Sequence, residues 1–533
     1  NIINKNEYKF SDKFKINQFV NVSVAHNTPM PVSAFTNAYK QSPIVPVRYP
    51  NGRFGVPFVN PATGLSDMIG DKFNNVANPV AQLFNTYEEN KEVVLTGSLA
   101  AELQIIKDLK FNSTFGATGV WINGYTFSPN REIWLSQNPS LEADNYEEIQ
   151  GEDAPINTLQ QRTYNSFYWN WDNYFTYKKQ FGENNLTVVL GMSQTTTNNS
   201  EYLNGTRYNV PDKSNYWYLD LSSDYNPINP NTVVQNAHTT PIVSIAYFTR
   251  VEYDYKGKYL ISGSYRREGI SVFQNEQRWG DFPAISAGWV ISKEDFMENA
   301  SFVNLLKLRG GYGELANGNG PSYNNVAFSN SAYPFGDPTI SQPGIFVANA
   351  VDPNLTWESV NELDFGLDFA FLDNRITGSF DYYNRVSDNL ILPVSPPYVL
   401  SEEPTYVNAG SIKNNGIEVT LRWDDTIGDD FHYYIGGNFS MNNNEVATIT
   451  SPYFQNFSGS GSLNNGEYTK LVKQGEPLGS FYVFDQIGYN SDGAPLFNDM
   501  VDGIAGLTDN DRINAGSYVP QNTYGINLGF DYK

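Results

Sequence analysis

Few residues in this chain have the type and spacing that covalent chemistry needs. Two adjacent carboxylate pairs, Glu147-Glu148 and Glu402-Glu403, could form the acid and base of a glycoside hydrolase, which needs two carboxylates across the scissile bond. Such pairs in Asn- and Pro-rich segments are more often solvated charge. The three histidines, His26, His238 and His432, are too scattered for a Ser-His-Asp arrangement. Since cysteine is also absent, we expect no enzyme.

One segment has the length and some of the ligands of a calcium loop. Asn498 stands at its first position and Asp509 at its twelfth, with Asp502-Gly503 between them. Met500 occupies the third position, and a thioether does not bind a hard cation. We therefore interpret Asn498, Asp502 and Asp509 as a degraded calcium loop, and predict neither a metal site nor a cofactor.

The strongest candidate for ligand binding is an aromatic run, Asn215-Tyr216-Trp217-Tyr218-Leu219-Asp220. Aromatic rings next to carboxylates and amides suit ligands with apolar faces and polar edges, such as sugars or peptides. We predict that Tyr216, Trp217 and Tyr218 bind substrate. Packing between loops, or contact with a partner protein, stays open as the alternative.

The elements that would position these loops alternate apolar and polar residues. In 363–371, for example, Leu, Phe, Leu, Phe and Phe alternate with Asp, Gly, Asp and Ala. This period of two is typical of β-strands with one apolar and one polar face, and we find no helical period of comparable length. The sequence predicts fifteen strands, near 2–10, 14–26, 92–107, 110–118, 158–180, 185–194, 240–255, 258–268, 282–292, 302–313, 361–372, 375–392, 415–424, 430–445 and 521–533.

Short and long connections alternate along the chain. The long ones, rich in Asn, Ser, Gly and Pro, are 27–91, 119–157, 195–239, 269–281, 314–360, 393–414 and 446–520. Every second connection of an up-and-down barrel lies on the same rim, so this parity predicts short turns on one rim and long outward loops on the other. We therefore predict an all-β, antiparallel, up-and-down transmembrane β-barrel rather than a soluble sandwich, whose Greek-key connections need not alternate.

Composition is consistent with that prediction. The 533 residues carry 34 basic and 57 acidic side chains, a net charge of −23, which disfavours nucleic acid as a partner. Aromatic residues make up 15% of the chain, and Tyr and Trp favour the membrane interface. The acidic loops are expected to meet lipopolysaccharide through divalent ions. The rival class is a secreted β-rich polysaccharide-binding protein or hydrolase.

Several motifs resemble one known family. They are Tyr247-Phe248-Thr249-Arg250-Val251-Glu252-Tyr253, Arg278-Trp279-Gly280-Asp281-Phe282-Pro283, Leu306-Lys307-Leu308-Arg309-Gly310-Gly311-Tyr312-Gly313 and Asn408-Ala409-Gly410-Ser411-Ile412-Lys413-Asn414-Asn415-Gly416. In this order they resemble the SusC/RagA family of TonB-linked outer-membrane transporters of Gram-negative bacteria. With further matches, the resemblance covers about half of the chain. Residues 1–240 match in layout more than in motif.

The resemblance implies a 22-stranded barrel closed by a plug domain and energised through TonB. It also implies import of large nutrients, oligosaccharides or peptides, beneath a SusD-like surface lipoprotein that acts as a lid. We expect this chain to be a central barrel segment without the N-terminal plug and the C-terminal strands. A passive porin without a plug is the second alternative.

Overall fold

The computed structural model describes residues 1–56, 59, 65, 77–151, 154–223, 233–274, 276–318, 328–334, 341–347, 352–394, 405–450, 456–458, 469–499 and 506–532. The chain divides into two compact units. The first contains Asn1–Ala101, Thr114–Trp171 and Thr195–Ile242, and the second contains Glu102–Ser113, Asp172–Gln194 and Val243–Lys533.

Within the described part of residues 1–241 there are eight strands and four α-helices. In chain order the elements are β1 (Ile2–Ser11), β2 (Phe14–Asn27), α1 (Val32–Lys40), α2 (Pro79–Phe84), β3 (Tyr87–Ile106), β4 (Leu109–Ser128), α3 (Asn130–Gln137), α4 (Asp144–Gln150), β5 (Thr158–Phe181), β6 (Asn184–Thr197), β7 (Ser200–Tyr208), the 3-10 turns η1 (Ser214–Tyr216) and η2 (Leu219–Leu221), and β8 (Val233–His238). Within the first unit β1 pairs with β2, β5 with β7, and β7 with β8, all antiparallel.

The described part of residues 242–533 forms mostly antiparallel β-strands. Its elements are β9 (Ile242–Tyr255), β10 (Tyr259–Ile270), β11 (Trp279–Val290), η3 (Ile291–Lys293), η4 (Asp295–Met297), β12 (Val303–Asn317), β13 (Phe328–Pro334), β14 (Ser341–Val347), β15 (Glu358–Phe371), β16 (Ile376–Asp388), β17 (Ile391–Val394), β18 (Thr405–Asn408), β19 (Gly410–Ile427), β20 (Phe431–Ile449), β21 (Asn456–Ser458), β22 (Leu471–Lys473), β23 (Ser480–Phe484), β24 (Gln486–Tyr489), β25 (Pro495–Phe497), η6 (Asp509–Asp511), β26 (Arg512–Ser517) and β27 (Asn522–Tyr532).

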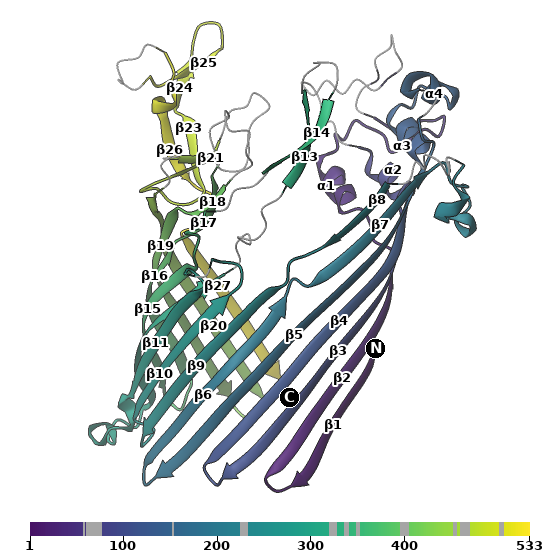
Figure 1. Cartoon of the computed structure of the whole chain (residues 1–533). Helices are drawn as coiled ribbons and strands as arrows, with labels where there is room; N and C mark the ends of the chain where they lie inside the picture. The colour runs from purple at the N-terminus through teal and green to yellow at the C-terminus, as the bar shows by residue number, and fades with distance from the viewer. Residues whose placement is uncertain are drawn as a thin grey trace. The chain divides into compact units, whose positions relative to one another are not determined.

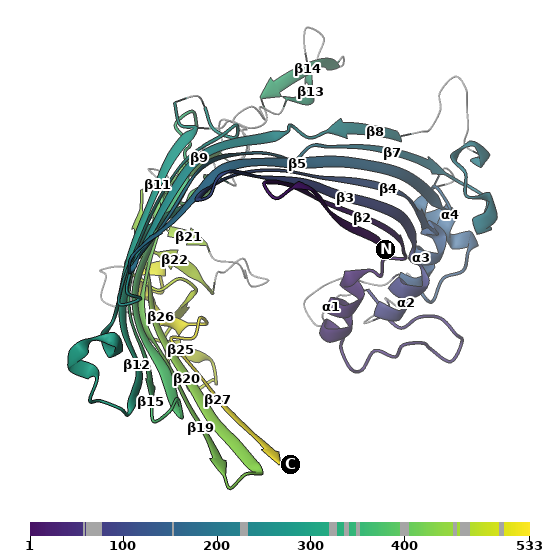
Figure 2. The ribbon, with the colours of Figure 1, turned by 90° about the horizontal axis from the view of Figure 1, so that it is seen from below.

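The long strands of the second unit pair with their neighbours in antiparallel register. The order β9-β10-β11-β12-β15-β16-β19-β20-β27 follows from the paired residues, and these strands lie side by side in Figure 1. Figure 2 shows β19, β20 and β27 next to one another, with the C-terminus at the end of β27. Each connection follows the up-and-down pattern that the alternating loop lengths predict.

Each of the fifteen predicted strands overlaps a long strand of the structure, namely β1 to β6, β9 to β12, β15, β16, β19, β20 and β27, and the predicted strand 375–392 also reaches into β17. The predicted loops were wrong in detail. The predicted loop 195–239 contains β7 and β8, and short paired strands occupy parts of 314–360, 393–414 and 446–520. The predicted loop 119–157 begins too early, because β4 continues to Ser128.

The α-helices are short and lie in the predicted loops 27–91 and 119–157. In α2 the side chain of Asn78 caps the helix by accepting hydrogen bonds from the backbone N–H groups of Val80 (3.1 Å) and Ala81 (3.2 Å), and Pro79 fits the first helical turn. Such helices, six to nine residues long, are too short for a reliable 3.6-residue pattern. In the described part of the chain no helix combines the length and the apolar character needed to cross a membrane.

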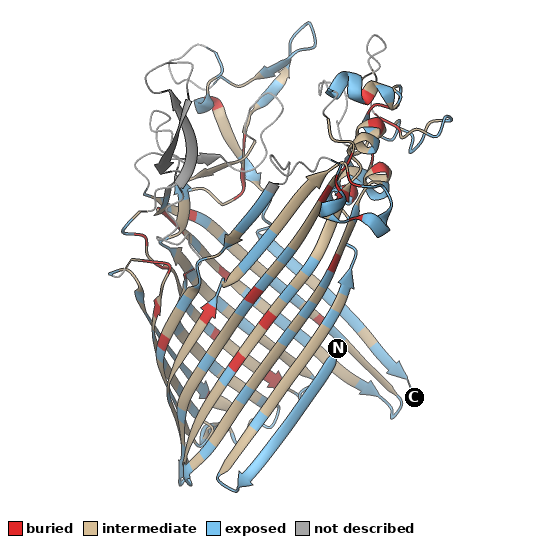
Figure 3. Cartoon of the chain, turned by 45° about the vertical axis from the view of Figure 1, so that its right-hand side comes forward, coloured by how far each residue is buried: buried red, intermediate tan, exposed pale blue. Residues whose placement is uncertain are grey.

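Burial is sparse along the long strands. Most of their positions are half-buried or exposed, and few residues are buried (Figure 3). Exposed side chains include many large apolar ones, such as Ile261, Ile285 and Phe365. A soluble protein rarely leaves so much apolar surface exposed, so these faces are suited to a non-aqueous neighbour.

Candidate functional site

The polar face of the second unit carries a cluster of charged residues on β12, β15 and β16. Arg309 Nη1 lies 3.2 Å from Asp364 Oδ1, and its Nε lies 3.2 Å from Asp368 Oδ2. The Nη2 of Arg309 donates to Asp381. Lys307 Nζ stands 3.9 Å from Asp368 Oδ2 at the margin of the cluster. Three carboxylates therefore surround one guanidinium, which satisfies its donors in several directions at once.

The register of the strands explains how Arg309 reaches Asp381. Arg309 pairs with Gly366 on β15, and Gly366 pairs with Asp381 on β16. A Cβ atom on Gly366 would lie 2.5 Å from Arg309 Nη1 and 2.7 Å from Asp381 Oδ1. Glycine at 366 therefore leaves room for the guanidinium to pass over β15 to Asp381 on the next strand.

Next to this cluster the polar face is hollow. Ser262, Ser286 and Gly311 stand opposite one another on β10, β11 and β12, and a cavity of about 510 Å³ lies over them. Glu252 on β9 pairs with Ser262 at one side, and Asp364 pairs with Gly311 at the other. Small side chains thus form the floor of a polar hollow with carboxylates at both sides.

The opposite face of the same strands is apolar and exposed. Ile261 is 51% exposed, Ile285 60% and Phe365 52%. Each of them is the direct chain neighbour of a residue on the polar face, because side chains alternate across a strand. A wall with an aqueous face and a lipid face has this distribution.

A compact ion-pair cluster lies at the turn that follows β11. Lys258 Nζ is 2.8 Å from Asp295 Oδ1 and 3.3 Å from Glu294 Oε2, and Glu294 also accepts hydrogen bonds from Tyr259 OH (2.6 Å) and Trp289 Nε1 (2.9 Å). The hydrogen bond from Tyr259, with those from Trp289 and Lys258, lowers the pKa of Glu294. The hydrogen bond from Lys258 lowers the pKa of Asp295. These contacts fasten the turn to β10 and β11.

In the first unit, Trp217 is the centre of an aromatic cluster. Its ring stacks on Phe127 at a centroid distance of 4.2 Å, and it meets Tyr125 (5.4 Å) and Tyr87 (5.7 Å) edge to face. Trp217 is 8% exposed, and with Phe127, Leu159 and Val210 it forms a buried core. Edge-to-face and offset-stacked rings are the favoured geometries of aromatic pairs.

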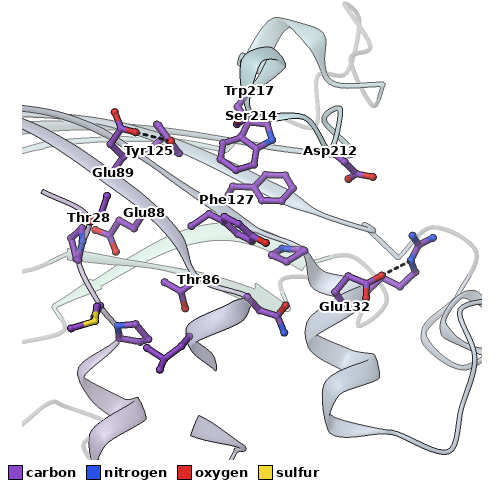
Figure 4. Close-up of a pocket in the computed structure, with 18 of the residues that line it drawn as sticks. Thr28, Thr86, Glu88, Glu89, Tyr125, Phe127, Glu132, Asp212, Ser214 and Trp217 are labelled. Carbon is purple, nitrogen blue, oxygen red and sulfur yellow. Dashed lines mark hydrogen bonds and ion pairs between the residues drawn. The ribbon is translucent and has the colours of Figure 1, made fainter. Parts of the chain in front are cut away.

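A cavity of about 630 Å³ adjoins the aromatic cluster (Figure 4). Its lining includes four carboxylates, which belong to Glu88, Glu89, Glu132 and Asp212. Arg131 is the cation of the lining, and its Nε lies 3.8 Å from Glu132 Oε1. Tyr87, Tyr125, Phe127 and Trp217 contribute aromatic surface. The cavity therefore combines an aromatic wall with an acidic rim.

The strand faces show on which side of the sheet the aromatic cluster lies. Along β3, Tyr87 and Glu89 are an even number of residues away from the exposed Leu95 and Leu99, so they point to the same face of the strand. Tyr125 and Phe127 on β4 likewise share the parity of the exposed Trp121. The cluster therefore lies on the same face of these strands as their exposed apolar side chains, at the loop end.

The structure places the three predicted aromatic ligand residues in different environments. Trp217 lies in the buried cluster and lines the cavity, whereas Tyr216 and Tyr218 are exposed and absent from the lining. Sequence reasoning could not separate them, because the separation depends on which ring meets Phe127 across the fold. That all three bind substrate stays a prediction.

The predicted calcium loop is only partly described. Asp502 lies outside the described residues. The backbone N–H of Asn498 donates to the carbonyl of Asp485 (2.8 Å), and Asp509 pairs with Arg512 through Nε (2.9 Å). Within the described ranges no three acidic or histidine side chains are grouped so that they could hold a metal ion.

Sequence reasoning missed two groups of charged residues. Arg309 belongs to the motif 306–313, but the sequence does not show its three carboxylate partners, because they are set by the pairing of β12, β15 and β16. Arg131 lay in a predicted loop, although α3 fixes it at the cavity. The alternation of Asp364, Gly366 and Asp368 was the available signal for the first group, since it placed them on one polar face.

Comparison with known proteins agrees with this architecture. The family described as "TonB dependent receptor-like, beta-barrel" matches residues 37–533. TonB-dependent receptor P3 of Formosa agariphila is 27% identical over 477 residues, which are 86% of this chain and 45% of that protein. TonB-dependent receptor SusC of Bacteroides thetaiotaomicron is 29% identical over 342 residues, which are 62% of this chain and 32% of SusC. The chain thus spans less than half the length of these relatives.

A solved structure shows the same fold. The structure titled "Structure of the RagAB peptide transporter" superposes with a TM-score of 0.76 at 18% identity, over 99% of this chain and 55% of that chain. The match to the family covers nearly all of the sequence, and the wall has one apolar and one polar face. The chain therefore belongs to the TonB-dependent receptor family and matches its outer-membrane β-barrel.

Proposed function

We propose that this chain forms part of the wall of an active importer that carries large nutrients, oligosaccharides or peptides, across the bacterial outer membrane. The polar face of β9 to β16 is the observation that carries the proposal. Its Arg309 cluster and its hollow over Ser262 and Ser286 are unsuited to lipid and suited to water and a polar solute. The relatives are named TonB-dependent receptors, which supports transport rather than catalysis.

Two partners complete the proposal. TonB supplies the energy through a plug domain that belongs to the remainder of the protein. A SusD-like surface lipoprotein covers the loop end and captures cargo. Support for both comes from the similarity to SusC and to a RagAB transporter, and the long loop segments offer the surface that a lid needs.

Energised uptake tests the proposal. Cells that carry or lack the gene receive labelled oligosaccharides or labelled peptides, with and without a protonophore. We expect uptake that needs the gene and stops with the protonophore. Uptake that persists with the protonophore, with steady conductance in planar bilayers, would instead identify a passive porin.

The partners are tested separately. Gentle detergent extraction of the outer membrane, followed by mass spectrometry, should recover a longer polypeptide together with a surface lipoprotein. Recovery of a 533-residue protein alone from the aqueous fraction would support the secreted carbohydrate-binding alternative and contradict the proposal.

A further inference from the structure

We propose that the turn between β11 and β12 docks on phospholipid and anchors the wall in the membrane at its short-turn rim. This turn occupies 291–302, whereas the turns between β9 and β10, β15 and β16, and β19 and β20 occupy only 256–258, 372–375 and 428–430. The short turns of an outer-membrane barrel face the periplasm, where the adjacent leaflet is made of phospholipid. The proposal goes beyond the import function, because it names a lipid partner and does not depend on the cargo.

The turn folds back over the apolar face of the strands. Tyr259 on β10 and Trp289 on β11 stand directly opposite each other. They are an even number of residues away from the exposed Ile261 and Ile285, so all four side chains point to the same apolar face. Both Tyr259 OH (2.6 Å) and Trp289 Nε1 (2.9 Å) donate hydrogen bonds to Glu294 Oε1 in the turn. Glu294 therefore lies on the apolar face, and Figure 2 shows the coiled turn between β11 and β12 projecting on the convex side of these strands.

The charged groups at the base of the turn are paired with one another. Lys258 Nζ lies 3.3 Å from Glu294 Oε2 and 2.8 Å from Asp295 Oδ1. The side chains of Lys258 and Glu294 are only 16% and 14% exposed. A charge can leave water when it is paired and hydrogen-bonded. The base of the turn can therefore lie against a membrane without leaving these charges unpaired.

Two phenylalanines of the turn remain exposed. Phe296 is 69% exposed and Phe302 is 58% exposed. The ring centroid of Phe302 lies 6.3 Å from that of Phe371 on β15, and Phe371 shares the apolar face with the exposed Phe365. Phe302 thus extends the apolar face, and Phe296 lies beyond it in the turn. Aromatic side chains in such a position are suited to the boundary between lipid head groups and acyl chains.

The turn also carries a cation for the lipid head groups. Lys293 is exposed and forms no ion pair with the residues that the structure describes, whereas Lys256 Nζ pairs with Glu183 at 2.8 Å. A Cβ atom on Gly257 would lie 2.7 Å from Lys293 Nζ, so the ammonium group stands over the turn between β9 and β10. Lysine side chains near a membrane surface attract its phosphate groups. Lys293 is therefore available for a lipid phosphate when Phe296 enters the leaflet.

Continuity with the apolar face of the wall favours lipid as the occupant. Tyr259 and Trp289 stand at the turn end of the face that carries Ile261 and Ile285, and both direct a polar group to the turn. Tyr and Trp take this arrangement at a membrane interface, where the ring meets lipid and the polar group meets head groups. A protein partner on this turn would have to displace lipid from the same face.

Electron paramagnetic resonance of the full-length protein tests the proposal in liposomes of phosphatidylethanolamine and phosphatidylglycerol. A nitroxide label is attached to Phe296→Cys, and the 533 residues contain no other cysteine. Ile261→Cys marks the lipid face, and Asp429→Cys, exposed in the turn between β19 and β20, marks water. The label at 296 should collide with oxygen in preference to a water-soluble nickel chelate, as the label at 261 does. A preference equal to that of the label at 429 would overturn the proposal.

A second label reports on the turn while Phe296 is in place. It is attached to Asn299→Cys, which is exposed in the same turn. Adding Phe296→Ser should raise the collisions of this label with the nickel chelate, because the turn then leaves the leaflet. The matched control is Tyr489→Ser on β24, which is also 69% exposed but lies in a predicted outward loop, and it should leave the collisions unchanged. Equal effects of the two serine variants would overturn the proposal.

The lysine contact has a test of its own. Lys293→Gln should raise the collisions of the label at 299 in phospholipid liposomes and leave them unchanged in liposomes of an uncharged glycolipid, which has no phosphate. The effect of Phe296→Ser should persist in both kinds of liposome. An equal effect of Lys293→Gln in both would overturn the phosphate contact.

Discussion

Replacing Gly366 by alanine should break the contact between Arg309 and Asp381. The new Cβ would lie 2.5 Å from Arg309 Nη1 and 2.7 Å from Asp381 Oδ1, so the guanidinium must leave its place above the strand. Side chains of Arg309 and Asp381 are 32% and 17% exposed, which shields their interaction only in part. We therefore estimate a loss of about 1–2 kcal/mol, between the values for exposed pairs and for buried charged hydrogen bonds.

Alanine also recovers part of that loss, because glycine within a strand costs about 0.5 kcal/mol in chain entropy. The net destabilisation of Gly366→Ala is then about 1 kcal/mol, or roughly a fivefold change in the ratio of folded to unfolded protein. Urea unfolding in detergent micelles, followed by tryptophan fluorescence, measures this difference as a shift in midpoint.

The matched control is Gly313→Ala on the polar face of β12. Its new Cβ would meet Ala284 Cβ at 3.5 Å, an ordinary contact, so this variant should be as stable as the parent or slightly more stable. In an Arg309→Met background the penalty of Gly366→Ala should disappear. Equal midpoints for the two alanine variants, or a penalty that persists without Arg309, would refute the reasoning.

Three further predictions concern the turn, the aromatic cluster and the calcium-like loop. Because the pKa of Glu294 is lowered in the folded protein, its contribution to stability is present above the ordinary glutamate pKa and is lost as pH falls from about 4 towards the lowered value. In a plot of the unfolding midpoint against pH, Glu294→Gln should therefore reduce the fall at acid pH. Phe127→Leu removes the ring stacked on Trp217 and should destabilise the first unit by about 1–2 kcal/mol, seen as faster limited proteolysis of the loops, whereas unchanged proteolysis contradicts the packing. Chelation with EDTA should leave the midpoint unchanged in the parent and in Asp509→Asn, and a chelator-dependent shift that Asp509→Asn abolishes would restore the calcium interpretation.

The strands were predictable from sequence because their pattern is local. Leu363, Phe365 and Leu367 alternate with polar residues, and the structure places Phe365 on the exposed apolar face. The end of β4 was less predictable. Gly119 and Gly124 suggested a loop, yet both lie within β4, which continues to Ser128, and the missing Cβ of Gly124 leaves room for the side chain of Asn90 on the neighbouring strand β3.

The candidate site was predictable only in part, because its contacts join distant segments. The aromatic run containing Trp217 was visible in the sequence, but its burial depends on Phe127, ninety residues away in a segment predicted as loop. The acceptors of Arg309 likewise come from two other strands. The sequence pattern shows which residues share one face of a strand. Which residues meet across the sheet depends on the register in which neighbouring strands pair.

The central claim is that one face of the wall meets lipid and the other meets water. The chain has no cysteine, so single cysteines at neighbouring positions of β10 can report on the two faces without background. In intact outer membranes, Ser262→Cys should react with a charged, water-soluble thiol reagent, while Ile261→Cys should resist it and react with a lipid-soluble one. Rapid labelling of Ile261→Cys by the charged reagent, at the rate found for Ser262→Cys, would contradict the account.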